Sequence, residues 1–194
     1  MTFVLDTFWS EQTVEHMDVA QKTFATLQAP FAELVDMCAG SVASGGKIMF
    51  FGNGGSAADA QHLATELTVR YINNRKPIPA IALTTDTSAL TAIGNDLGFD
   101  HLFSRQIDAL GSAGDIAIGI STSGNSQNVL NALQTARDKN IMTVGFSGKD
   151  GGKMADVCDL LLTIPSPTTA RIQEMHITLG QMLCGALEQK LGLV

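Results

Sequence analysis

Residues 47–70, KIMFFGNGGSAADAQHLATELTVR, contain the pattern that decides the fold. Residues 48–51 form an apolar run of strand length, and the apolar residues after Ser56 recur at helical spacing. Between them lies the turn at residues 52–56, whose glycines allow positive φ angles and a close approach of the backbone to a ligand. The first amides of a helix are unpaired, and the helix dipole favours negative charge there. The pattern therefore predicts an anion site, with Ser56 as helix N-cap or phosphate ligand, although an ordinary strand-to-helix turn explains it equally well.

Two polar residues follow this turn on the same predicted helix. His62 and Glu66 are four residues apart, so their side chains project from one face of the helix. An imidazole and a carboxylate at this spacing can hold a metal ion or move protons. A solvated helix face explains most such pairs, but the position just behind an anion-type turn favours a functional pair.

Composition limits the class of protein. The 194 residues suffice for one domain with a buried core. No apolar run approaches the roughly 20 residues of a membrane span, and the first residues lack the basic segment of a secretory signal. The scattered cysteines, Cys38, Cys158 and Cys184, are typical of reduced thiols in the cytoplasm. The net charge of -7 argues against nucleic acid, so backbone groups and hydroxyls must hold any phosphorylated ligand. We therefore expect a cytoplasmic protein without nucleic-acid or membrane partners.

Short apolar runs alternate with helical segments along the chain. The expected strands are residues 48–51, 80–83, 115–120, 141–146 and 160–164. This alternation predicts an α/β protein, in which helices cover both faces of a parallel sheet as a three-layer αβα sandwich. We expect one domain over residues 1–194, with a core at 46–194.

The segments around the core lead to three further expectations. Residues 1–45 should form two helices with a break near residues 28–30, and their apolar residues suit packing against another subunit or against the domain core. The helix after the second strand should be interrupted at residues 94–96 and resume at 101–110. A long helix at residues 169–191 should close the chain.

A second polar turn, STSGNS at residues 121–126, follows the third expected strand. In open α/β sheets, ligands bind beyond the carboxyl ends of the strands, so this turn should face the same crevice as residues 52–56. Four of its six residues carry hydroxyl groups. A cradle for phosphate oxygens is therefore favoured over a helix merely capped by serines.

Six motifs in order resemble a known family: GNGGSAADAQH, LTTDTSALTAIGND, FSRQ, ISTSGNS, GKDGGKM and RIQEMH. Together they look like a sugar isomerase (SIS) domain, and specifically like the phosphoheptose isomerase family, from about residue 46 to 191. The resemblance implies a flavodoxin-like sheet and a homotetramer with active sites at subunit interfaces. It also implies conversion of D-sedoheptulose 7-phosphate to D-glycero-D-manno-heptose 7-phosphate, the first step of heptose biosynthesis for lipopolysaccharide or capsule.

The resemblance also implies site residues. The substrate would be held by Asn53, Gly54, Gly55, Ser56, Glu66, Asn95, Asp96, Ser121, Thr122, Ser123, Ser126 and Gln173. Members of the family that bind Zn²⁺ use the residues matching His62, Glu66, Gln173 and the position of Gln181. That last position is usually histidine, and here this chain departs from the family. Residues 173 and 181 are a little over two helical turns apart, so both can reach one site.

Aldose–ketose isomerisation moves a proton between adjacent carbons through an enediol, which requires a base and a second group or a metal to handle the oxygens. Glu66 can serve as the base. The second catalytic position would be Gln181, where an amide cannot shuttle protons near neutral pH and is a poor zinc ligand. The alternatives are a non-catalytic SIS protein that binds the replication initiator, and a sugar-phosphate sensor. Retention of Glu66 favours the isomerase over the first, and the sequence shows no DNA-binding segment of the second.

Overall fold

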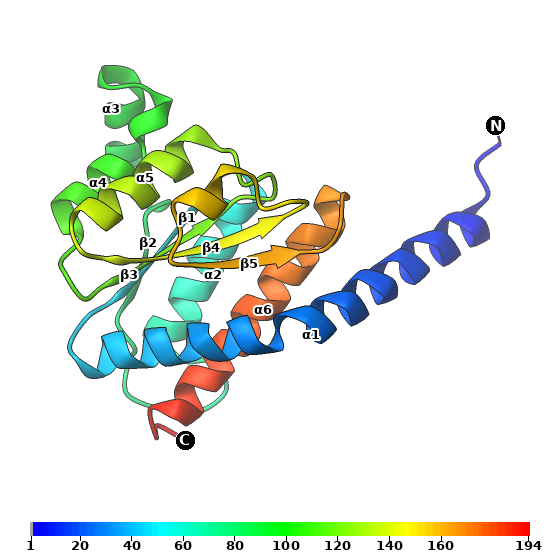
Figure 1. The fold of residues 1–194 in the computed structure, drawn as a ribbon, viewed down its shortest axis with the longest axis horizontal. Coiled ribbons are helices and arrows are strands. Elements are labelled where there is room, and N and C mark those ends of the chain that lie inside the picture. The colour runs from blue at the N-terminus through cyan, green and yellow to red at the C-terminus, as the bar shows by residue number, and fades with distance from the viewer. Residues whose placement is uncertain (1) are drawn as a thin grey trace.

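The computed structural model describes residues 2–194. Its centre is a sheet of five parallel strands in the order β2–β1–β3–β4–β5 (Figure 1). The strands are β1 (Ile48–Gly52), β2 (Ala80–Ala82), β3 (Ile116–Ile120), β4 (Met142–Gly148) and β5 (Leu160–Ile164). This order confirms the flavodoxin-like arrangement, and each strand lies within two residues of its predicted bounds. Because β2 and β3 flank β1 on opposite sides, the strand order reverses between β1 and β3, which is where ligands bind in such sheets.

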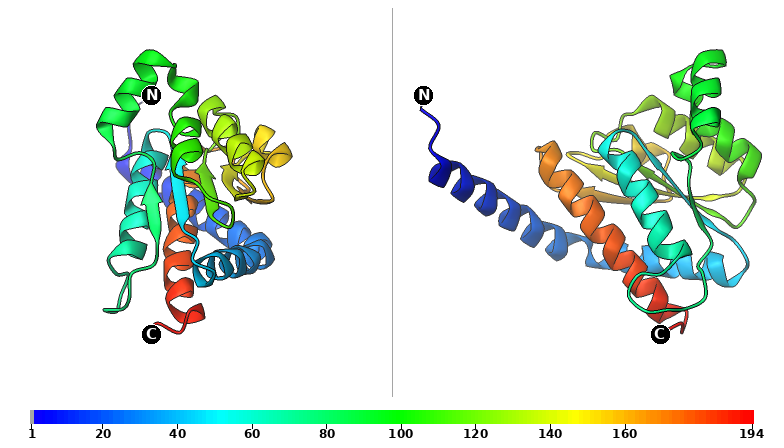
Figure 2. Two further views of the ribbon diagram at one scale, coloured as in Figure 1. Left: turned by 90° about the vertical axis from the view of Figure 1, so that its left-hand side faces the viewer. Right: turned by 180° about the vertical axis from the view of Figure 1, so that it is seen from behind.

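Helices cover both faces of the sheet, as predicted (Figures 1 and 2). One face carries α1 (Leu5–Ala43), α2 (Gly55–Thr68) and α6 (Thr169–Lys190), and the other carries α3 (Thr87–Asp96), α4 (Ser104–Leu110) and α5 (Gln127–Asp138). Alternate side chains of β1 show the two layers, since Ile48 and Phe50 join the first core and Met49 and Phe51 the second. All five residues of β1 are buried, as expected for a strand between two helical layers.

The N-terminal segment is one helix, so the predicted break near residues 28–30 is wrong. The helix α1 runs without interruption through Pro30 and bends part-way along its length (Figures 1 and 2). Proline removes one helical hydrogen bond and bends a helix rather than always ending it. Here Leu27 and Leu34, on either side of the proline, are both buried in the same core, and this shared packing keeps the helix continuous.

A second correction concerns the region after β2. Asp86 caps α3 by accepting a hydrogen bond from Ala89 N (3.0 Å), as the polar run before the helix predicted. The helix then continues through residues 94–96, where an interruption was expected. An interior glycine costs only about 1 kcal/mol, and the packing of Ile93 in the second core offsets that cost. The predicted helix at 101–110 divides into a 3₁₀ turn, η1 (Phe99–His101), and α4.

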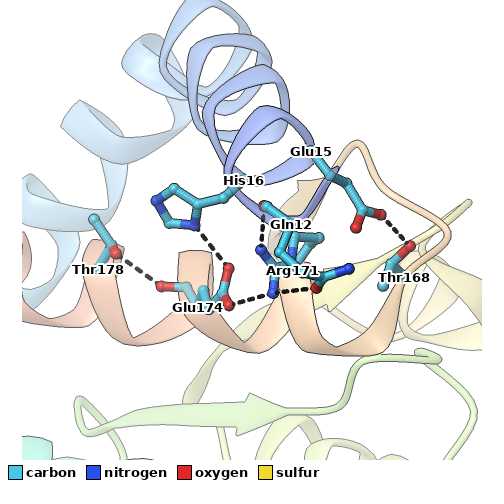
Figure 3. Close-up of polar contacts among 7 residues, drawn as sticks. All are labelled: Gln12, Glu15, His16, Thr168, Arg171, Glu174 and Thr178. Atoms are coloured by element: carbon cyan, nitrogen blue, oxygen red, sulfur yellow. Dashed lines mark hydrogen bonds and ion pairs between the residues drawn. The ribbon is translucent and has the colours of Figure 1, made fainter. Parts of the chain in front are cut away.

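Polar contacts fix the first half of α1 against the start of α6 (Figure 3). Arg171 donates to the carbonyl oxygen of Gln12 (3.0 Å) and pairs with Glu174 (2.8 Å). The other carboxylate oxygen of Glu174 lies 2.8 Å from Nδ1 of His16. These contacts set the direction in which α1 leaves the body of the molecule.

Candidate active site

The two polar turns lie side by side at the carboxyl edge of the sheet. The strands β1 and β3 pair along their length, with Gly52 opposite Ile120, so residues 53–56 and 121–126 emerge next to each other. A reciprocal pair of hydrogen bonds joins the turns: Asn53 Nδ2 donates to Asn128 Oδ1 (2.8 Å), and Asn128 Nδ2 donates to Asn53 Oδ1 (2.9 Å). The predicted common crevice is therefore present, but the side chain of Asn53 is turned toward Asn128 rather than presented freely to a ligand.

Glycines shape the first turn. The N-cap of α2 is Gly54, with φ 58°, a conformation that other residues rarely adopt. A Cβ on Gly55 would lie 2.7 Å from Nε2 of Gln173, so only glycine lets α6 approach this turn so closely. The expectation that Ser56 caps the helix is wrong, because the cap falls two residues earlier and Ser56 lies buried inside the first helical turn.

The second turn is held on both sides. Oγ of Ser121 and Oγ of Ser126 lie 3.0 Å apart, which closes the turn on itself. On the far side, the backbone of the 3₁₀ turn η2 (Gly152–Asp156) reaches it, with Met154 N donating to Gly124 O (3.0 Å). Thr122 and Ser123 remain half-buried, so their hydroxyls lie at the surface beside the first amides of α5. Such an arrangement suits the oxygens of a phosphate group.

The helices α2 and α6 bring the predicted acid–base residues together. His62 Nε2 lies 3.2 Å from Glu66 Oε1, and the side-chain amide of Gln181 contacts the same nitrogen. Close packing makes this possible, since a Cβ on Gly180 would lie 2.5 Å from Cδ1 of Leu63. We call His62, Glu66 and Gln181 the polar row. Gln173 lies two helical turns away on α6, against Gly55.

The polar row fits zinc poorly. Zinc sites in proteins are built from cysteine, histidine and carboxylate ligands. Among residues 2–194, no three histidine, cysteine, aspartate or glutamate side chains are grouped closely enough to hold a metal ion. The four positions implied by the resemblance supply one imidazole, one carboxylate and two neutral amides. Zinc at this site therefore stays a prediction, and one that the donor set does not favour.

Asn95 and Asp96 lie at the exposed end of α3, where Asn95 Nδ2 donates to Asp96 Oδ1 (2.7 Å). Within residues 2–194, no printed hydrogen bond or ion pair joins either side chain to the two turns or to the polar row. Their predicted role in binding substrate stays a prediction.

Two supporting features escaped the sequence-based reasoning. One is Asn128, whose place two residues after the serine turn is the only local signal that it could take part. The other is the buried pair of Arg75 and Glu188, 2.8 Å apart, with side chains 1% and 3% exposed. Arg75 also donates to the carbonyl oxygens of Glu66 (2.8 Å) and Leu67 (2.6 Å). It thereby ties the end of α2, which carries Glu66, to the end of α6.

A buried histidine anchors α6 to the sheet. His176 is 1% exposed, and its Nε2 lies 2.9 Å from the carbonyl oxygen of Ser147 at the end of β4. Burial lowers the pKa of His176 to about 4, while this hydrogen bond acts in the opposite direction. The side chain is therefore neutral at physiological pH, which makes it a structural contact rather than a proton carrier.

An open parallel sheet with two anion-type turns at its switch point is the architecture of an α/β protein that binds a phosphorylated small molecule. Comparisons with known proteins agree. The family model of the SIS domain matches residues 14–148. The phosphoheptose isomerase of Paramagnetospirillum magneticum is 58% identical over 182 residues, covering 94% of this chain and 95% of that protein.

Two solved structures are similar over almost the whole chain. A phosphoheptose isomerase from Neisseria gonorrhoeae has a TM-score of 0.91 at 44% identity and covers 96% of this chain and 100% of its own. One from Francisella tularensis has a TM-score of 0.93 at 33% identity and covers 97% and 100%. The chain therefore belongs to the SIS domain family and, within it, to the phosphoheptose isomerases. No helix within residues 2–194 is long and apolar enough to span a membrane.

Proposed function

We propose that the chain is an aldose–ketose isomerase that converts D-sedoheptulose 7-phosphate to D-glycero-D-manno-heptose 7-phosphate, the step that begins heptose biosynthesis. The observation that carries this proposal is Glu66, a half-buried carboxylate on the helix that starts at the first anion-type turn, in a chain 58% identical to a phosphoheptose isomerase. A non-catalytic SIS protein that binds the replication initiator would not need this carboxylate, and the comparisons do not favour that alternative.

In the proposed reaction, the two turns hold the phosphate and fix the sugar relative to α2. The hydroxyls of Thr122 and Ser123 and the amides at the starts of α2 and α5 supply neutral donors for the phosphate oxygens. Glu66 removes a proton from C1 of the ketose, which gives an enediol, and returns a proton to C2, which gives the aldose. The amide of Gln173 lies between the turn and the polar row, where it can donate to a sugar hydroxyl.

The test is incubation of the purified protein with D-sedoheptulose 7-phosphate in D₂O, followed by NMR. We expect the anomeric signals of an aldose phosphate, together with deuterium at C2 in the fraction of turnovers that exchange the abstracted proton with solvent. Binding of the substrate without any aldose would overturn the isomerase and support a binding protein. Fructose 6-phosphate serves as the control substrate, because its shorter chain places the phosphate at a different distance from C1.

We further propose that copies of this chain assemble into a homotetramer through the first half of α1. Large apolar side chains are exposed there, including Phe3 (71%), Trp9 (69%) and Met17 (69%), on a helix that extends away from the body (Figure 2). Exposed apolar surface of this extent marks protein interaction sites. Light scattering should give four times the mass of one chain. We expect Trp9→Glu to lower that mass and Phe99→Glu, on the opposite side of the sheet, to leave it unchanged.

The location that we propose is the cytoplasm. Three free cysteines support it, because a reducing compartment keeps such thiols unpaired. Burial raises the pKa of Cys158 and of Cys184 to about 12, so both are inert thiols rather than reactive ones.

A further inference from the structure

The inference concerns the nitrogen of His62 that faces Glu66 and Gln181, and it rests on the proposed function only for the role of Glu66. In the neutral imidazole, Nε2 carries either a lone pair or a proton. With a lone pair, it accepts an N–H from the Gln181 amide. With a proton, it donates to Glu66 Oε1, 3.2 Å away, and the amide can turn its oxygen toward the ring. In both forms, groups of this chain already occupy the position that a metal ion would take.

The remaining donors do not compensate for this competition. Glu66 is the only anionic side chain in the row, and Gln181 adds an amide where a third strong ligand would be needed. Loss of a partner outside the ligand shell already costs about 10- to 100-fold in metal affinity, so replacing a ligand by an amide should cost at least as much. We propose that this site does not retain zinc, and that the amide of Gln181 takes the place of a metal ion in holding His62 and, through it, the carboxylate of Glu66.

This makes Gln181 a positioning residue. It does not move protons, but it fixes the imidazole ring, which in turn limits the positions open to the Glu66 carboxylate. The contact joins α2 to α6 across 119 residues of sequence, at the point where Gly180 and Leu63 bring the two helices together. The geometry of the base is thus set by hydrogen bonds within the chain.

Zinc affinity tests the first half of the proposal without any substrate. Zinc per chain is measured by mass spectrometry after equilibration at buffered free zinc, in the unaltered protein, in Gln181→His and in Gln189→His. Gln189 is exposed on the same helix, so the last variant controls for a histidine that is merely added to α6. We expect Gln181→His to bind zinc at least about 100-fold more tightly than the other two. Equal, stoichiometric binding by the unaltered protein and Gln181→His would overturn the proposal.

Kinetics test the second half. We expect a chelator to leave the turnover of the unaltered protein unchanged, and Gln181→Ala to lower kcat about 10-fold while KM stays within about twofold, as for a group that acts on the transition state only. Gln189→Ala should match the unaltered protein. Loss of turnover on chelation, or full kcat in Gln181→Ala, would overturn the proposal. If no form converts the sugar, the proposed function fails, while the zinc measurement still decides this inference.

Discussion

The two halves of the candidate site are built in different ways. The turns at residues 53–56 and 121–126 follow directly from strands that pair with each other, and neutral hydrogen bonds between Asn53 and Asn128 join them. The polar row on α2 and α6 instead depends on how two helices pack, and a buried ion pair closes its lower end. The comparison teaches that the ligand-holding half is local and tolerant, whereas the reacting half is distant in sequence and easily disturbed. Four predictions test this difference.

The largest effect should come from the carboxylate of the polar row. Glu66→Gln keeps the shape of the side chain but removes the base, so we expect turnover to fall by about 10³- to 10⁴-fold with little change in KM. Steady-state kinetics with D-sedoheptulose 7-phosphate measure it. Glu33→Gln, at an exposed position on α1, is the matched control and should be fully active. An active Glu66→Gln would remove the base from this half of the site.

The next effect should come from the ion pair that supports the row. Arg75→Met leaves the carboxylate of Glu188 buried without its partner, which should lower the free energy of unfolding by about 3–5 kcal/mol. Urea denaturation measures it. The double variant Arg75→Met/Glu188→Gln should recover part of the loss, because the amide is neutral and its oxygen still accepts from Tyr71 N.

Lys190→Met is the control for this prediction. Its pair with Asp36 on the same helix is exposed on both sides, so removing it should cost less than about 1 kcal/mol. Equal effects of Arg75→Met and Lys190→Met would mean that the buried pair gives no special support to α2 and α6.

A third effect should appear as the pH falls. The pKa of His176 is about 4 in the folded protein and 6.5 for the model group, so between these values the unfolded chain binds more protons. The stabilising contribution of neutral His176 is therefore complete above about pH 6.5 and lost as the pH falls toward 4. The total loss should be roughly 3 kcal/mol.

His176→Gln should flatten this pH dependence, because an amide can still donate to Ser147 O but does not titrate in this range. Urea denaturation at pH 7, 6, 5 and 4.5 measures it, with the exposed His101→Gln as the control. If His176→Gln and the unaltered protein lose stability in parallel below pH 6.5, another group is responsible.

The smallest effect should come from the ligand-holding half. Asn128→Ala removes both hydrogen bonds to Asn53, so we expect a loss of about 1–2 kcal/mol in stability. Because the turns then move relative to each other, KM should rise several-fold while kcat changes little. Gln134→Ala, at an exposed position on the same helix, is the control. A kcat effect as large as that of Glu66→Gln would erase the distinction between the two halves.

Particular elements show how far the sequence could be read. The strand β5 was predicted at its observed bounds, and Asp86 caps α3 as its position before that helix indicates. Pro30 and Gly94 misled the prediction, because each disfavours a helix locally while buried neighbours on both sides keep the helix intact. Local preference is a matter of a few kcal/mol, and core packing overrides it.

The sequence by itself determined the α/β class, the parallel sheet, the two anion-type turns and the family, because apolar periodicity and turn chemistry act over a few adjacent residues. Only the tertiary structure decided that Asn53 faces Asn128, that Arg75 reaches Glu188 and that Gln181 meets His62. These pairs are 75, 113 and 119 residues apart. Each depends on the relative placement of separate helices and turns, which the packing of the whole core sets and no local pattern encodes.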